Sequence, residues 1–125
     1  MCPVATQDIA TNLANRRKAI DVASYGPANP RLPNRAYWQH LAAQWGISEA
    51  EAMTMRCGNC AAFDISPELI GCINAGLAEQ GIDAQDVIVA AELGYCHAFR
   101  FKCAASRTCS AWIVGGPIRQ YRGAR

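Results

Sequence analysis

The chain has 125 residues and a net charge of +2 at neutral pH, and 51% of its residues are hydrophobic. This length suits a single domain, and the composition excludes an intrinsically disordered chain. The charge is too small to favour nucleic acid as a partner. No run of about 18 apolar residues is present that would favour a membrane-spanning helix.

The N-terminus lacks the basic start and the following apolar run that mark a signal peptide. We therefore expect a protein that is made and kept in the cytoplasm, or in an assembly formed there. The chain has seven cysteines, and an odd number in a reducing compartment counts against a full disulfide framework and favours metal ligation. The C-terminal tail is locally basic through Arg119, Arg122 and Arg125, and we interpret it as a solvated chain end.

The first predicted element is an amphipathic helix over residues 6–24, capped by Thr6. Its apolar residues recur at helical spacing and are Ile9, Leu13 and Ile20. The following stretch, Tyr25–Pro33, has three prolines within seven residues, which force extended and turn geometry. Because extended segments bury much surface per residue, we interpret this arm as the contact to other protein subunits, with a simple linker as the alternative.

A second helix is predicted over residues 34–45, with Trp38, Leu41 and Trp45 on one face. Ser48 and Glu51 have the spacing of a capping box, which predicts a short helix that ends near Arg56. These features divide the chain into residues 1–47, with two helices and the arm, and residues 48–125, which carry most of the cysteines. We expect both parts to form one compact unit.

The sequence Ser66-Pro67-Glu68 is a strong helix start, and the helix should end at Gly81. Residues 83–93 fit either a strand, through Val87-Ile88-Val89, or a helix, through the alanines, and we favour a helix. From Gly94 onward the chain is predicted to form turns around cysteines. The fold class is therefore a small, α-rich and largely irregular domain that a metal holds together.

One pair of cysteines, in Cys57-Gly58-Asn59-Cys60, forms a C-x-x-C turn. Two intervening residues let both sulfurs reach one metal centre. Such a turn occurs in zinc knuckles, in redox dithiols and in iron–sulfur sites, so it does not by itself select among them.

An aromatic residue three positions after a cysteine is a more selective pattern. It occurs at Cys60 with Phe63, at Cys96 with Phe99 and at Cys109 with Trp112, but not after Cys2, Cys72 or Cys103. A 4Fe–4S cluster with four thiolates gains from aromatic walls, because they keep water from the sulfides and tune the reduction potential. The pattern predicts a cluster held by four thiolates: Cys57, Cys60, Cys96 and Cys109.

These motifs resemble those of the high-potential iron–sulfur proteins, which use C-x-N-C before an aromatic residue, a third cysteine followed by x-x-Phe, and a fourth in C-x-x-Trp. The resemblance covers Arg56–Val114 and implies the same four ligands. It implies cluster-enclosing rings at Phe63, Tyr95, Phe99 and Trp112. The 35 residues between Cys60 and Cys96 exceed the gap in that family and hold the helix predicted from Ser66.

A second resemblance covers the whole chain. The segments Tyr25–Pro30, Cys57–Phe63 and Phe101–Cys109 are similar to stretches of small proteins encoded by tailed bacteriophages. This resemblance implies that the chain is a component of the virion, where its partners would be other subunits of the particle.

Several alternatives remain open from the sequence. A zinc site of three cysteines and His97 is one, although Cys96 and His97 are adjacent and hard to place on the same ion. The role of Cys2 is open. Cys72 and Cys103 fit buried free thiols, with a disulfide between them as the alternative. Cys103 also lies between the third and fourth predicted ligands and is a competing candidate for a ligand position. Nothing resembles a Ser-His-Asp or Cys-His catalytic set, so we expect no enzymatic activity.

The sequence thus predicts a structural protein whose 4Fe–4S cluster stabilises the fold. An electron carrier of the high-potential type is the first alternative. It is less favoured because such a cluster would stay reduced in the cytosol. A zinc-stapled interaction module is the second alternative.

Overall fold

The N-terminal residues form two helices where the sequence predicts one over 6–24. The computed structural model describes residues 1–81 and 84–118, so Asp83 and the basic tail with Arg119, Arg122 and Arg125 lie outside the described residues. Helix α1 spans Val4–Gln7 and helix α2 spans Ile9–Ala23. The break falls at Asp8, whose carboxylate accepts a hydrogen bond from the Thr11 backbone N–H at 3.1 Å. Asp8 rather than Thr6 therefore caps the long helix.

Two of the three residues of the predicted apolar face of α2 do not face the core, whereas Ile20 is half-buried against it. Ile9 and Leu13 are 54% and 56% exposed, whereas Asn12, Ala19 and Ala23 are the buried residues of this helix. The Asn12 side chain accepts a hydrogen bond from the Lys102 backbone N–H at 2.7 Å. Helix α2 covers the edge of a sheet, where a polar side chain can accept a hydrogen bond from an unpaired strand N–H. The need to pair this N–H places Asn12, rather than Ile9 and Leu13, on the buried face of the helix.

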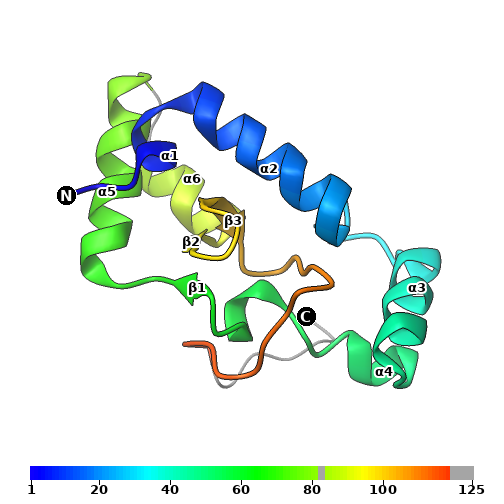
Figure 1. The fold of residues 1–125 in the computed structure, drawn as a ribbon. Helices are drawn as coiled ribbons and strands as arrows, with labels where there is room; N and C mark the ends of the chain where they lie inside the picture. The colour runs from blue at the N-terminus through cyan, green and yellow to red at the C-terminus, as the bar shows by residue number, and fades with distance from the viewer. Residues whose placement is uncertain (82–83, 119–125) are drawn as a thin grey trace.

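Helices α3 (Arg35–Trp45) and α4 (Glu49–Ala52) confirm the next two predicted helices. The Ser48 hydroxyl caps α4 by accepting from the Glu51 backbone N–H, but the helix ends at Ala52, short of Arg56. The two helices pack into a small core of their own (Figure 1). This core therefore joins the two parts of the chain that the sequence divides at residue 47. Its buried members are Trp38, Leu41, Ala42 and Ala52.

Helix α5 (Pro67–Glu79) begins where Ser66-Pro67 predicts, and the Ser66 hydroxyl accepts from the Leu69 backbone N–H. Helix α6 (Ala84–Ala91) confirms the helical interpretation of the ambiguous stretch. The two pack together through a second core, with Ile73, Leu77 and Ala84 buried. Helix α1 lies beside α5 (Figure 1), and Cys2 and Cys72 join the two segments by a disulfide.

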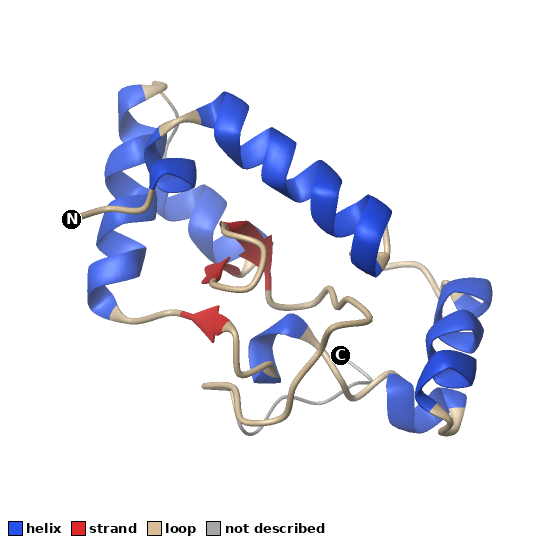
Figure 2. Ribbon diagram, viewed as in Figure 1, coloured by secondary structure: helices blue, strands red, loops and turns tan. Residues whose placement is uncertain are grey.

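The structure contains, in its described residues, three short strands that the sequence did not predict. Strands β1 (Phe63–Asp64), β2 (Leu93–Cys96) and β3 (Phe101–Ala104) form an antiparallel sheet in the order β1-β2-β3. Figure 2 shows this small sheet among the helices, with loops on one side of it. Strands of two to four residues carry too little alternation to be recognised, and pairing with partners far along the chain stabilises them. The α-rich fold class itself is confirmed.

The arm begins as an integral part of the fold. The Gly26 backbone N–H donates to the Thr108 carbonyl at 3.0 Å, and the Thr108 N–H donates back to Gly26 at 2.7 Å. Tyr25 is buried, while residues 31–33 are exposed. Half of the arm is therefore held by its own chain, and only the second half is accessible to a partner. Within the described residues, no helix combines the length and the apolar character needed to traverse a membrane.

Candidate metal centre

Five free thiols surround a single small cavity. They come from the 3-10 turn η1 (Cys57–Asn59) and its end, from β2, from β3 and from the loop that follows β3. The cavity has a volume of about 20 Å³, and every side chain on its wall is apolar, aromatic or a thiol. The structure therefore brings the four predicted ligands together and adds Cys103. The thiols are those of Cys57, Cys60, Cys96, Cys103 and Cys109.

The C-x-x-C turn is fixed by the loop that carries the fourth predicted ligand. The Cys57 backbone N–H donates to the Arg107 carbonyl at 2.6 Å, and the Gly58 N–H donates to the Ala105 carbonyl at 3.0 Å. A Cβ at Gly58 would lie 3.0 Å from a methyl group of Ile118 and 3.2 Å from the Ala105 side chain. The crowding explains why a residue without a side chain stands between the two cysteines.

Two of the four aromatic residues singled out by the sequence line the cavity. Phe63 and Phe99 form part of its wall. Trp112 instead donates its indole N–H to the Arg56 carbonyl at 3.0 Å and to Asn59 Oδ1 at 2.9 Å. Tyr95 packs edge-on against His97. The two remaining aromatic wall residues are Tyr25 and Phe101, which the cysteine-centred pattern missed.

Backbone N–H groups point at three of the thiols. The backbone N–H groups of Ala62 and Ile113 favour the ionised form of Cys60 and so oppose the effect of burial on its pKa. The Cys96 sulfur accepts a hydrogen bond from the N–H of Phe99, at 3.4 Å, and the N–H of Ala98 also favours its ionised form.

Cys109 completes this set, because the backbone N–H of Ala111 favours its ionised form, although burial has the larger effect on its pKa. In all three cases the chain turns back after the cysteine, and one of these N–H groups belongs to the residue two positions on, just before the aromatic residue. This turn gives the repeated cysteine–aromatic spacing a structural basis.

The thiols differ in acidity because their surroundings differ. A hydrogen bond from the Cys103 thiol outweighs desolvation and lowers the pKa of Cys96 to about 6. Burial raises the pKa of Cys109 to about 12 and also raises that of Cys60. Cys103 is the most deeply buried, at 1% exposure, and desolvation holds its pKa well above the ordinary value. The cavity therefore resists a build-up of negative charge unless a cation neutralises it.

Cys103 holds a central position among the thiols. Its sulfur is hydrogen-bonded with both Cys57 and Cys96. Phe101 and Cys103 are the two buried residues of β3 and face the same side of the strand. The alternation in Phe101-Lys102-Cys103-Ala104 is consistent with this position, but four residues are too few to predict a strand from the sequence.

The remaining residues considered as ligands lie elsewhere. His97 Nε2 lies 2.8 Å from Asp64 Oδ2, so its ring is engaged with a carboxylate and does not line the thiol cavity. Cys72 is bonded to Cys2, with 5.5 Å between their Cα atoms, so it is not the buried free thiol that the sequence predicts. The alternative disulfide between Cys72 and Cys103 is therefore wrong, because Cys72 faces α1 and Cys103 faces the cavity.

The thiols are arranged around the cavity rather than converging on one point. Among residues 1–81 and 84–118, no three His, Cys, Asp or Glu side chains are placed to hold one metal ion. Comparisons with protein-family models, with curated proteins and with solved structures give no match to this chain. The function must therefore be argued from the chemistry of the site.

Proposed function

We propose that the chain binds a 4Fe–4S cluster through Cys57, Cys60, Cys96 and Cys109, and that the cluster stabilises the fold. The observation that carries the proposal is the grouping of the four predicted ligands around one apolar cavity, where backbone N–H groups favour the thiolates of Cys60, Cys96 and Cys109. Such donors stabilise a thiolate and set the potential of a cluster. Together with the apolar wall, they form an enclosure suited to a thiolate-bound cluster.

The thiol ligands suit an iron–sulfur cluster, but the cavity is too small to hold one without a change in the structure. Soft thiolate ligands favour iron–sulfur clusters, copper(I) or zinc. Each thiolate of a cubane binds a different iron, so the sulfurs surround the cluster, as the thiols surround this cavity. A volume of about 20 Å³ holds little more than one water molecule. The wall must therefore part when a cluster binds.

The fifth thiol is assigned to a supporting role. Cys103 lies on a paired strand and is hydrogen-bonded with Cys57 and Cys96. Its neighbours in sequence do not form the turn that directs N–H groups at the other sulfurs. We therefore expect Cys103 to donate an S–H hydrogen bond to ligand sulfurs rather than to bind iron.

A structural role is favoured over electron transfer by the composition of the core. Cys57, Phe63, Phe101 and Cys103 are themselves members of the largest buried cluster, which joins α2, the sheet and the turn η1. The two other cores are small and belong to separate helix pairs. A cluster at this position would link η1, the sheet and the loop after β3, which few helices or long strands hold in place. The electron carrier is the second candidate.

The resemblance to phage-encoded proteins leads us to propose that the chain is a subunit of a tailed-phage particle. The exposed side chains of Ile9, Leu13 and Leu32 provide apolar surface that a neighbouring subunit would cover. Purification of particles and mass spectrometry of their components tests this part of the proposal separately.

The metal is identified by analysis of protein purified without oxygen from iron-replete cells. We expect a brown protein with about four iron and four acid-labile sulfide per chain. Stoichiometric zinc without sulfide would reject the cluster and favour the zinc-stapled module.

The ligands are identified by serine variants of single cysteines. Serine at Cys57, Cys60, Cys96 or Cys109 should abolish the visible spectrum and lower the yield of folded protein. Cys103→Ser is the matched control, because it changes a thiol of the same cavity, and it should keep the colour. If Cys103→Ser loses the colour while Cys109→Ser keeps it, Cys103 is the fourth ligand and Cys109 is not.

Removal of the cluster separates the two candidate functions. If the cluster stabilises the fold, chelation should abolish the helical circular dichroism as a whole, because binding free energy of the order of 10 kcal/mol is comparable to the stability of a domain. Retention of the helical signal with fast, reversible electron exchange to a cytochrome would favour the carrier.

A further inference from the structure

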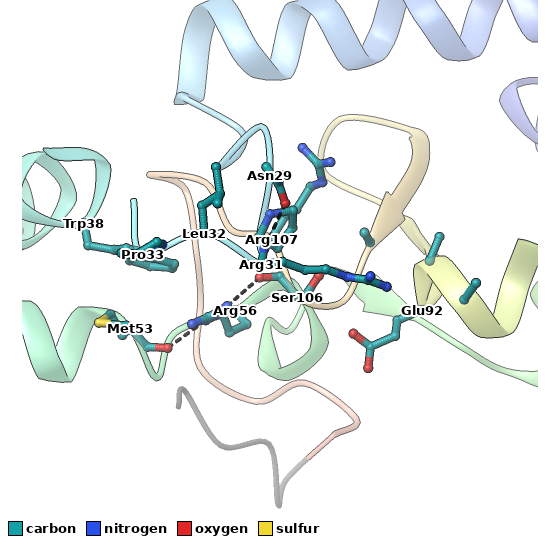
Figure 3. A pocket seen from close by; sticks show the side chains of 14 residues that line it. Asn29, Arg31, Leu32, Pro33, Trp38, Met53, Arg56, Glu92, Ser106 and Arg107 are labelled. Atoms are coloured by element: carbon teal, nitrogen blue, oxygen red, sulfur yellow. Dashed lines mark hydrogen bonds between the residues drawn. The ribbon is translucent and has the colours of Figure 1, made fainter. Parts of the chain in front are cut away.

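A second cavity lies on the other side of the segment that follows β3. It has a volume of about 750 Å³, within the range of small-molecule binding pockets, and it shares no wall residue with the thiol cavity. The exposed half of the arm forms one wall, and the turn after α4, the end of α6 and residues 104–107 form the others. Figure 3 shows arginine side chains across the middle of this pocket.

Positive charge dominates the described wall. It carries three arginines, Arg31, Arg56 and Arg107, against one acidic residue, Glu92. Arg107 donates to the carbonyls of Pro27 at 2.8 Å and Ala28 at 3.0 Å. Carbonyl oxygens satisfy N–H groups but carry no formal charge, so the charge of Arg107 is not neutralised by these bonds.

The arginines differ in how firmly their neighbours hold them. Arg56 is 3% exposed and is fixed by hydrogen bonds to the carbonyls of Met53 and Ser106, with its guanidinium 4.6 Å from the centre of the Trp38 ring. Arg31 is exposed, and among the described residues its guanidinium has no hydrogen-bond or ion-pair partner. The pocket therefore combines arginines held in place with one that is available to close over a ligand.

We propose that this pocket binds a small ligand through an oxyanion group, a phosphate or a carboxylate, held by Arg31 and Arg107. Guanidinium groups present paired N–H donors that match both oxyanions, and such charged hydrogen bonds are stronger than neutral ones. In Figure 3, Trp38, Pro33 and Met53 lie at the end of the pocket opposite Glu92. The ligand would place its apolar part against these side chains, away from the carboxylate.

The proposal is tested with inorganic phosphate, pyrophosphate and citrate on the intact protein, by calorimetry and by thermal shift. We expect at least one of these anions to bind. The affinity for phosphate compared with that for citrate shows whether the pocket prefers a phosphate or a carboxylate. Arg31→Gln should weaken binding by about tenfold, the loss of one charged hydrogen-bonding partner. Because Arg31 is exposed, this variant should fold normally.

The matched control is Arg17→Gln, which removes the same charge from an exposed position of α2. This control should leave the affinity unchanged. The proposal is overturned if none of the three anions binds at millimolar concentration. It is equally overturned if Arg31→Gln binds as the unaltered protein does, or if both variants weaken binding alike, since the effect would then come from net charge alone.

Discussion

The indole N–H of Trp112 donates a hydrogen bond to Asn59 Oδ1 at 2.9 Å, and the same oxygen accepts from the Arg56 backbone N–H at 2.9 Å. The Asn59 amide donates in turn to the Thr54 carbonyl at 2.8 Å. Two motifs more than fifty residues apart, C-x-N-C and C-x-x-Trp, are thus joined by one side chain. Their aromatic and amide residues fix the turn that presents Cys57 and Cys60.

Trp112→Phe should lower the free energy of unfolding by roughly 1–3 kcal/mol, because it leaves Asn59 Oδ1 and the Arg56 carbonyl without this donor. Urea unfolding measures the change. Trp45→Phe is the control, since its indole makes one longer hydrogen bond, of 3.3 Å, to Ser110. Equal losses in the two variants would show that ring burial, and not the bond to Asn59, sets the effect.

Gly94→Ala should be destabilising by about 1–3 kcal/mol, because a Cβ at this position would clash with the ring of Phe63 in the wall of the thiol cavity. Gly71→Ala is the control. No atom lies within 4 Å of a Cβ at Gly71 in helix α5, so alanine should stabilise by about 0.5–1 kcal/mol. Thermal unfolding measures both, and a neutral Gly94→Ala would show that Phe63 is free to move.

The disulfide between Cys2 and Cys72 closes a segment of 70 residues. Its loss in the double variant Cys2→Ser, Cys72→Ser should cost about 4 kcal/mol by the loop-entropy relation. The visible spectrum should be unchanged, because neither residue lines the thiol cavity. A stability that does not respond to a reducing agent in the unaltered protein would show that the bond is not formed in solution.

The carboxylate of Asp64 links stability to acid pH. Desolvation opposes its ionisation, but hydrogen bonds from His97 and Ser66 outweigh this and lower its pKa below the ordinary 3.8. The stabilising contribution is therefore fully present above the unfolded pKa of about 3.9 and is lost as pH falls through the folded value. Asp64→Asn should be less stable near pH 6 and should show a shallower loss of stability on acidification below about pH 4. Urea midpoints over this range measure both, and parallel curves for the two proteins would contradict the assignment.

The sequence by itself determined the features that depend on neighbours along the chain. The helix start at Ser66-Pro67 and the helices over 34–45 and 83–93 were predictable, because caps, proline and apolar spacing act locally. The prediction that Cys57, Cys60, Cys96 and Cys109 are ligands also comes from local spacing, and it stays a prediction. In three of them the residues just after the cysteine turn their N–H groups back to the sulfur.

Only the tertiary structure decided which side chains meet across the chain. Cys103 enters the thiol cavity because β3 pairs with β2, and Cys72 bonds to Cys2 because α1 packs on α5. Ile9 and Leu13 stay exposed because α2 covers a strand edge through Asn12 and small residues. In each case a contact between distant segments outweighs the local pattern, since burial and hydrogen-bond satisfaction depend on the neighbour that the fold supplies.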